Sequence, residues 1–354
     1  MGYEKDISYE SIKFCLENKI NVITANKALL ANYGNELISI AEKNKSNLLF
    51  EASVAGAIPI INVLKTLLVS NNIIKILGIL NGTTNYILSK MQNDKIPFSE
   101  ALSDAKNKGY VEANPDLDLK GIDSAHKLSI LSSLTFKSRF SKLSNIYREG
   151  ISDINIIDID FADKFDLVIK LISTVEHNKN KLIQYVKPMM IDKNSQLGKV
   201  NGVLNGIQIT SEKIGNIFLE GQGAGGYATA SSIISDIYEI CNKKYSPILG
   251  IDFDKLKLIE NANIEDQFSS FYIRLNVLDK KGVLAEITSL FKDNNVSIET
   301  MIQNPDNFSR ENDSIPLLIV THETYLKNIN NLINKIANLD NVLDKPFVIQ
   351  IYKV

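Results

Sequence analysis

Residues 109–127 read Gly-Tyr-Val-Glu-Ala-Asn-Pro-Asp-Leu-Asp-Leu-Lys-Gly-Ile-Asp-Ser-Ala-His-Lys, a loop that runs into a helix. Pro115 and Gly121 interrupt regular structure, and apolar periodicity predicts a helix that opens near Asp123. Asp123 and Lys127 lie four residues apart, so both project from one face of that helix. Carboxylates gathered near one lysine suit a substrate that carries a cation and exchanges a proton. A solvated acidic loop with an ordinary surface ion pair is the alternative.

Length and composition indicate a globular protein with more than one domain. The chain has 354 residues, 44% hydrophobic and 23% charged, enough for two or three domains. A net charge of −2 without a long basic run argues against nucleic-acid and membrane-surface partners. Cys15 and Cys241 indicate a reducing cytoplasm, and the three histidines lack the spacing of a zinc or iron site. With no long uninterrupted apolar segment, we expect neither a signal peptide nor a membrane span.

The first fifty residues alternate helix and strand as in a parallel α/β sheet. Apolar spacing predicts helices at 7–18 and 28–44 and short strands at 21–24 and 48–51. A doubly wound domain normally opens on a strand and a glycine-rich phosphate turn, and no G-x-G-x-x-G occurs before residue 50. We therefore expect the first part of such a domain to be absent from this sequence.

A small-residue segment, a strand and a polar turn follow. Residues 52–72 are rich in Ala and Gly, which lets backbones approach closely or exposes carbonyls to an ion. A strand at 73–80 ends in Asn81-Gly82-Thr83-Thr84-Asn85-Tyr86, ahead of a helix at 87–92. Hydroxyls and amides at a helix start suit a bound carboxylate, although an ordinary Asn or Thr cap explains them equally well. A helix at 99–109 leads into the acidic loop.

The second half begins with a β-rich pattern. Strands of a mixed sheet are predicted at the apolar runs 154–159, 182–190 and 217–219. Gly221-Gln222-Gly223-Ala224-Gly225-Gly226 then precedes a helix at 229–241 and formally matches G-x-G-x-x-G. No second strand with an acidic end follows that helix. We therefore predict a close backbone approach at these glycines rather than a self-contained nucleotide motif.

The last part of the chain has its own order. Residues 242–268 are polar and are predicted to be a linker. Beyond them the pattern predicts βαββαβ, with strands at 271–277, 296–303, 315–321 and 347–352, helices at 283–293 and 324–338, and a polar hairpin at 305–313. No charged cluster there suggests chemistry, so binding or assembly is the better interpretation.

Together these motifs resemble the homoserine dehydrogenase family. The resemblance rests on five ordered segments: Thr24-Ala25-Asn26-Lys27; Phe50-Glu51-Ala52 with Ile58-Pro59-Ile60; residues 78–86; the acidic loop through Asp123 and Lys127; and Gly223-Ala224-Gly225 with Thr229-Ala230-Ser231. The tail resembles an ACT module, a small ferredoxin-like domain found on amino-acid-regulated enzymes. Five motifs in order are far more specific than one glycine pattern.

The resemblance implies a multidomain α/β protein. Residues 1–52 would be the remnant of a doubly wound, NAD(P)-binding parallel sheet, completed by about 221–245. Residues 53–220 would form a mixed-sheet α+β domain for catalysis and dimerisation. A linker at 246–268 would lead to a ferredoxin-like βαββαβ ACT domain at 269–354.

The resemblance also assigns roles to individual residues. It implies NAD(P)-dependent interconversion of L-homoserine and L-aspartate 4-semialdehyde, in threonine, methionine and isoleucine biosynthesis. Lys127 matches the lysine that moves the proton, and Lys27 matches a second functional lysine near cofactor and substrate. The other matches are substrate-binding Glu112, Asp118, Asp123, Gly82 and Thr83; cofactor-binding Asn26, Lys27, Gly223 and Gly225; and, for a sodium ion held mostly by backbone oxygens, Glu51, Val54, Gly56 and Ile58.

The expected partners follow from the same resemblance. They are NADP or NAD, a monovalent cation, the amino-acid substrate, and threonine as an effector of the ACT domain. We expect a cytoplasmic homodimer or homotetramer without nucleic-acid or membrane partners. The family's first strand and its G-x-G-x-x-G turn would precede residue 1, so we expect this chain alone to bind NAD(P) weakly. A catalytically silent fragment that serves as an amino-acid-binding regulatory protein is the alternative function.

Overall fold

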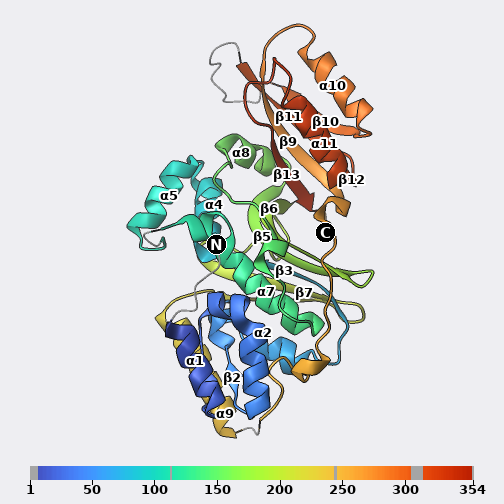
Figure 1. Ribbon diagram of the computed structural model, residues 1–354. Coiled ribbons are helices and arrows are strands. Elements are labelled where there is room, and N and C mark those ends of the chain that lie inside the picture. Colours follow the sequence, from blue (N-terminus) through green and yellow to red (C-terminus); the bar gives the residue numbers. More distant parts are fainter. Residues whose placement is uncertain (1–6, 112–113, 243–244, 304–313, 353–354) are drawn as a thin grey trace.

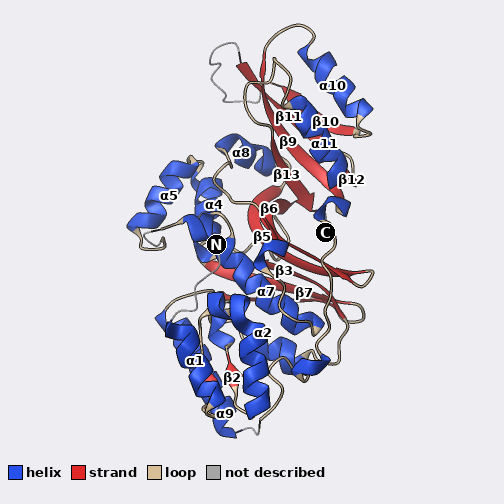
Figure 2. Ribbon diagram, in the orientation of Figure 1, coloured by secondary structure: helices blue, strands red, loops and turns tan. Residues whose placement is uncertain are grey.

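The computed structural model describes residues 7–111, 114–242, 245–303 and 314–352. Figure 1 shows three regions in succession: a mainly helical region (blue, with one yellow helix), a central sheet with helices on it, and a C-terminal unit (orange and red). Helices and strands are mixed throughout (Figure 2). Within the described ranges, no helix has the length and apolar character needed to span a bilayer.

The helical region is built from two α-β pairs. Its elements are α1 (Ile7–Glu17), β1 (Val22–Ile23), α2 (Lys27–Asn44) and β2 (Leu48–Leu49). The strands pair in parallel, with Val22 opposite Leu48. Helix α2 begins where the Asn26 side chain accepts a hydrogen bond from Leu29 N (3.0 Å). This cap fixes Lys27 in the first turn of α2, directly after strand β1.

A late helix returns to this region. Helix α9 (Gly226–Asn242) packs beside β1 and the short turn η1 (Glu51–Ser53), and Figure 1 shows it as the yellow helix of the helical region. Asp236 on α9 accepts a hydrogen bond from Glu51 N (3.0 Å), across 185 residues of sequence. Ser232 Oγ likewise donates to Gly56 O (2.7 Å). Two distant segments of the chain are joined in this way.

The central sheet is mixed and carries the middle region. Its strands are β3 (Ile73–Ile79), β4 (Tyr147–Arg148), β5 (Leu167–Asn178), β6 (Lys181–Asp192), β7 (Leu204–Ser211) and β8 (Gly215–Gln222). Strand β3 lies between β5 and β7 and is antiparallel to both. The helical elements are α3 (Ile60–Asn62), η2 (Val63–Leu67), α4 (Gly82–Asp94), α5 (Phe98–Asn107), α6 (Asp116–Leu119), α7 (Ile122–Phe136) and α8 (Ile156–Lys164). Helices α4, α7 and α8 pack on β5, and the predicted apolar face of α7, including Leu128 and Leu131, is fully buried.

One predicted strand is wrong. The apolar run 154–159 does not form a strand; it leads into helix α8, whose N-cap is Asn155. The Asn155 side chain accepts from Ile157 N, and Asp158 accepts from Asn155 N (2.8 Å), which completes a capping box. An apolar run alone cannot distinguish a buried helix from a strand, and here the capping residues decide the outcome.

The C-terminal unit has the predicted βαββαβ order. Its elements are β9 (Phe268–Leu278), α10 (Val283–Asp293), β10 (Ile298–Gln303), β11 (Ser314–Thr321), the short β12 (Thr324–Tyr325), α11 (Leu326–Ile336) and β13 (Phe347–Tyr352). The strand order β13-β9-β11-β10 is antiparallel throughout, and α10 and α11 close a core against it. This confirms the ferredoxin-like architecture. The hairpin predicted at 305–313 lies outside the described residues.

The C-terminal sheet and the central sheet are continuous. Strand β13 also pairs in parallel with β6, where Gln350 lies opposite Met189 and Tyr352 opposite Ile191. The strand order therefore runs β10-β11-β9-β13-β6-β5-β3-β7-β8. Nothing in the sequence predicted this pairing, which makes a seam between the two units.

Asp158 joins helix α8 to the C-terminal unit. Its carboxylate is fully buried and accepts hydrogen bonds from the Tyr272 hydroxyl (2.7 Å) and from Arg274 Nε (2.8 Å), both on β9. Burial raises the pKa of this carboxyl, and the charge of Arg274 offsets part of the rise. A single side chain thus caps α8 and pairs with two side chains of the neighbouring unit.

We expect Asp158→Ala to lower the free energy of unfolding by about 3 kcal/mol, because it leaves Arg274 Nε and the Tyr272 hydroxyl without their acceptor and removes a helix cap. Urea unfolding measures the change. Asp160→Ala on the same helix is the control, since the Asp160 side chain is 46% exposed, and its effect should stay within about 0.5 kcal/mol. Equal losses in the two variants would contradict the assigned role of Asp158.

Candidate active site

The acidic loop and the helix after it carry the site. After the single turn of α6, Gly121 has a φ of 72°, in the left-handed region that favours glycine. A Cβ there would also lie 3.0 Å from a methyl carbon of Val186. Helix α7 then begins at Ile122, so Asp123 and Lys127 occupy its first two turns on one face.

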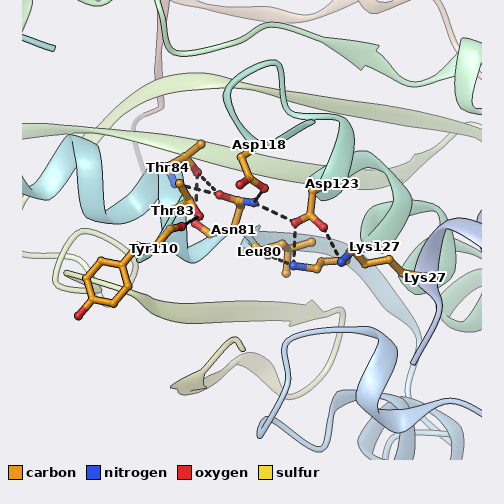
Figure 3. A network of polar contacts seen from close by, with 9 residues as sticks. All are labelled: Lys27, Leu80, Asn81, Thr83, Thr84, Tyr110, Asp118, Asp123 and Lys127. Carbon is orange, nitrogen blue, oxygen red and sulfur yellow. Dashed lines mark hydrogen bonds and ion pairs between the residues drawn. The ribbon is translucent and has the colours of Figure 1, made fainter. Parts of the chain in front are cut away.

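Asp123 is the centre of the charge cluster in Figure 3. One of its oxygens lies 2.8 Å from Lys127 Nζ and the other 3.0 Å from Lys27 Nζ. Lys127 Nζ also donates to the backbone oxygen of Leu80 (2.6 Å), just after strand β3. The side chains of Asp123 and Lys127 are only 9% and 10% exposed. The i,i+4 pair is therefore buried, unlike the surface ion pair of the alternative interpretation.

Asn81 connects this cluster to Asp118. Its amide nitrogen donates to Asp118 Oδ1 (2.7 Å) and to Asp123 Oδ2 (2.9 Å). Its amide oxygen accepts from Thr84 N (2.9 Å), so Asn81 is also the N-cap of helix α4. Sequence reasoning placed Asn81 only in a polar turn. Asn81 lies between the end of a strand and the start of a helix, three residues before a threonine. This pattern in the sequence is the signal that identifies it as an N-cap.

Burial and the two lysines shift the pKa of the Asp123 carboxyl in opposite directions. Burial raises the pKa of the Asp123 carboxyl, but the charges of Lys127 and Lys27 outweigh it and hold this pKa well below its usual range. The pKa of Asp118 is raised, mainly by burial and further by the charge of Asp123, although the hydrogen bond from Asn81 opposes the rise. Asp118 is thus the carboxylate whose charged form a bound cation would stabilise.

The polar turn at the start of α4 is tightly packed. A Cβ at Gly82 would lie 2.7 Å from Val203 O, so the close approach requires glycine. Thr83 Oγ1 donates to Tyr110 O (2.7 Å) and holds the chain where it enters the acidic loop. Glu112, the remaining carboxylate predicted to bind substrate, lies outside the described residues.

A cavity of about 250 Å³ opens beside the charge cluster. It is lined by Ala25, Asn26, Lys27, Ala28, Leu117, Asp118, Asp123 and His126. The start of α2 and the acidic loop thus bring Lys27, Asp118 and Asp123 together around one space. His126, which the sequence did not single out, is 4% exposed, and burial lowers its pKa.

The predicted cofactor glycines lie beside the predicted cation segment. A Cβ at Gly56 would come within 2.7 Å of Gly223 O, so the two loops are in close contact. Gly225 has a φ of 119°, and a Cβ built on it would meet no atom within 4 Å, which leaves open space at the start of α9. Neither Gly223 nor Gly225 is among the described residues that line the cavity at Lys27.

Glu51 lies under the cation segment as a buried helix cap. Its two carboxylate oxygens accept hydrogen bonds from Ile61 N and Asn62 N, each 2.8 Å. Burial raises the pKa of Glu51 to about 7 in spite of these bonds, and the charge of Asp236 adds to the rise. A cation near Glu51 would favour its charged form.

Comparison with known proteins places this geometry in a family. A family model described as Homoserine dehydrogenase matches residues 59–238, and one described as ACT domain matches residues 271–337. A homoserine dehydrogenase of Helicobacter pylori is 41% identical over 330 residues, which cover 93% of this chain and 76% of that protein. The chain belongs to the homoserine dehydrogenase family.

Further homoserine dehydrogenases agree with this assignment. The crystal structure of one from Thiobacillus denitrificans has a TM-score of 0.90 at 33% identity and covers 98% of this chain and 80% of that chain. A hyperthermophilic archaeal homoserine dehydrogenase in complex with NADPH has a TM-score of 0.57 at 30% identity, with 67% and 69% covered. The predicted family, its oxidoreductase class and the fold class are confirmed.

The site generates a pH prediction. Because the folded-state pKa of Asp123 is depressed, its ion pairs contribute their full stability above the unfolded pKa of about 4. This contribution decreases progressively as the pH falls from there and is lost only as the pH passes through the lower folded-state pKa. We expect Asp123→Asn to lower the free energy of unfolding by roughly 3 kcal/mol at neutral pH. The difference from wild type should shrink near pH 3, as measured by urea unfolding at both pH values.

Asp116 provides the matched control. It has the same i,i+4 spacing to Lys120, with 2.6 Å between the charged atoms, but the two side chains are 55% and 64% exposed. Asp116→Asn should therefore change the free energy of unfolding by less than about 0.5 kcal/mol at either pH. A loss for Asp123→Asn that persists undiminished in acid would contradict the cause assigned to it.

Proposed function

We propose that the buried cluster of Lys27, Asp123 and Lys127 is the catalytic centre for interconversion of L-homoserine and L-aspartate 4-semialdehyde. The observation that supports it is the Asp123 carboxylate held between two lysines, 2.8 Å and 3.0 Å away, at the wall of a cavity. Lys27 lines that cavity. Lys127 Nζ donates a hydrogen bond to the Leu80 carbonyl, which fixes its position. Charges fixed in this way need little rearrangement when substrate binds.

In this proposal Asp118 and Asp123 bind the substrate ammonium group. Both line the cavity, and the raised pKa of Asp118 means that a neighbouring ammonium would stabilise its charge. Asn81 holds the two carboxylates at fixed positions through its 2.7 Å and 2.9 Å hydrogen bonds. Glu112 takes the same role by family resemblance, and Gly82 and Thr83 take the substrate carboxylate at the start of α4.

Lys127 moves the proton of the reacting hydroxyl group. During oxidation the homoserine hydroxyl loses its proton while the adjacent C–H hydrogen leaves as hydride. Lys127 Nζ in its uncharged form accepts that proton, and in the reverse direction it returns a proton to the aldehyde oxygen. Asp123 orients Lys127 and stabilises the ammonium that forms. Lys27 places a positive charge on the cavity wall, where it stabilises negative charge developing on the oxygen.

The loop before α9 and the start of α2 fit a nicotinamide cofactor. NAD or NADP, when bound, accepts the hydride. The open space at Gly225 lies at the N-terminus of a helix of 17 residues, a favourable place for negatively charged groups. We assign Gly223 and Gly225 to one side of this cofactor, and Asn26 and Lys27 to the other. The archaeal relative in complex with NADPH supports a nicotinamide cofactor, and the residue roles are part of this proposal.

We expect Lys127→Ala to lower kcat by about 10²- to 10⁴-fold, because it removes the group that exchanges the hydroxyl proton. Homoserine affinity should change by less than about tenfold, since the ammonium-binding carboxylates remain. Steady-state kinetics with NAD and NADP measures the first effect, and calorimetry with homoserine measures the second.

Lys120→Ala is the control, because Lys120 is an exposed lysine of the same loop and is 64% exposed. It should leave kcat unchanged within about twofold. Near-normal turnover by Lys127→Ala would disprove the proton-transfer role. A wild-type chain that binds homoserine but turns over with neither cofactor would favour the silent regulatory alternative.

We also propose a sodium ion at the turn 54–58. Ala55 and Gly56 have φ angles of 57° and 50°, and an alanine held in this region is strained, as is common at ligand sites. Among the described residues, Gly56 O and Ile58 O each accept one hydrogen bond, which leaves each a second lone pair for a cation. The coordinating oxygens would come from the backbone of Glu51, Val54, Gly56 and Ile58.

Replacing sodium by choline at equal ionic strength should lower the melting temperature, because an ion that binds only the folded state stabilises it. Gly56→Ala should abolish this dependence, since its Cβ would lie 2.7 Å from Gly223 O. Gly109→Ala is the control: its φ of 73° is also left-handed, but its Cβ would meet open space. Equal melting temperatures in sodium and choline would contradict the site.

The finer biological assignments are proposals of the same kind. We propose that the ACT unit responds to an amino acid, with threonine as the first candidate, because ACT modules occur on amino-acid-regulated enzymes. We further propose a cytoplasmic homodimer or homotetramer in threonine, methionine and isoleucine biosynthesis. The domain boundaries given above, at 52/53, 220/221 and 268/269, belong to this proposal as well.

A further inference from the structure

A second cavity lies at the seam where the C-terminal unit joins the central sheet. Its volume is about 290 Å³, room for about ten water molecules. Its walls come from β3, β5 and β6 of the central sheet, from β9 and β13 of the C-terminal unit, and from the segments just before β9 and just before β12. Most side chains in these walls are polar or charged, so a polar ligand suits the cavity.

Lys75 provides the positive end of this cavity. Its Nζ lies 3.3 Å from a Glu176 carboxylate oxygen and 3.3 Å from the Tyr352 hydroxyl, and 4.5 Å from the centre of the Tyr352 ring. The Lys75 side chain is 18% exposed and joins β3, β5 and β13. An ammonium group has three donors, so these two partners leave one for a ligand carboxylate.

Gln350 provides an acceptor that lacks a partner. It is 5% exposed, and its Oε1 makes no hydrogen bond to any described residue. Gln350 and Tyr352 lie two residues apart on β13, so their side chains point to the same face and into the same cavity. A buried, unpaired amide oxygen is costly, and a ligand N–H group would satisfy it.

Besides Glu176, the two carboxylates Asp266 and Glu323 also line the cavity. We propose that this cavity binds a small α-amino acid, with its carboxylate at Lys75 and Tyr352 and its ammonium at Gln350 Oε1 and the two carboxylates. A cation and an unpaired acceptor in one cavity are complementary to a zwitterion. The inference rests on the proposed regulatory role of the ACT unit and is independent of the catalytic assignment.

The position of the cavity connects a ligand there to the catalytic centre. The parallel pairing of β13 with β6 spans only Gln350–Tyr352, and the ligand would contact two of these three residues. Strand β3 then runs from Lys75 toward Leu80, whose carbonyl holds Lys127. Five residues of strand cover about 17 Å. Occupancy of the cavity is therefore expected to change turnover as well as stability.

The test is a thermal-shift survey of the full chain with each common protein amino acid at millimolar concentration, followed by calorimetry. We expect at least one small amino acid to raise the melting temperature. Its N-acetyl and amide derivatives, which each lack one charge, should not raise it. Lys75→Met and Gln350→Leu should each weaken its binding about tenfold or more. Gln350→Leu replaces an unpaired amide with an apolar group of similar size, so it should fold even where Lys75→Met does not.

Two controls locate the bound ligand. Lys181→Met removes a lysine of β6 that is 51% exposed and should leave the affinity unchanged. Asp118→Asn alters the proposed catalytic cavity and should also leave the affinity for the amino acid unchanged. If Asp118→Asn abolished binding, the amino acid would instead be placed at the proposed catalytic site. The proposal is overturned if no amino acid shifts the wild-type melting temperature, or if both seam variants bind as wild type does.

Discussion

A buried carboxylate needs compensating charge, and Asp123 receives it from two separate elements. Lys127 comes from the next turn of the same helix, whereas Lys27 comes from the start of α2. Asn81 adds a third connection, from the end of β3. Because each of these partners stabilises the buried charge, the helical region, the acidic loop and the central sheet are held in one arrangement around this carboxylate.

The same contacts hold the groups of the proposed catalytic centre in position. Lys127 is held between Asp123 and the Leu80 carbonyl, so its amino group already has a defined position before substrate binds. Asp118 is held by Asn81 but its burial disfavours a negative charge, which an arriving ammonium would stabilise. Stability and the proposed substrate recognition therefore depend on one network, in a site where low exposure strengthens each electrostatic interaction.

The sequence predicted those elements and contacts that depend on a pattern within a few neighbouring residues. Helix α10 was predicted with the bounds that the structure shows, and the i,i+4 spacing placed Asp123 beside Lys127. Long-range contacts were different. The family resemblance placed Lys27 and Asp123 in one site but did not predict their ion pair, and the pairing of β13 with β6 was not predicted. Helix α8 was mistaken for a strand because its apolar run hides the capping box at Asn155. Strand pairing across the chain leaves no periodic trace in either partner.

The continuity of the sheet gives the missed pairing a physical consequence. Strand β3 is hydrogen-bonded on both sides, to β5 and to β7, so it moves with its neighbours rather than alone. The β13–β6 pairing, by contrast, spans three residue pairs, and it is the narrowest connection along the strand order. A change in the C-terminal unit therefore reaches the central sheet mainly through side chains that bridge the seam, among them Asp158 with Tyr272 and Arg274. Lys75 and Tyr352 meet across it, and coupling between the two units requires that this contact have two arrangements of different energy.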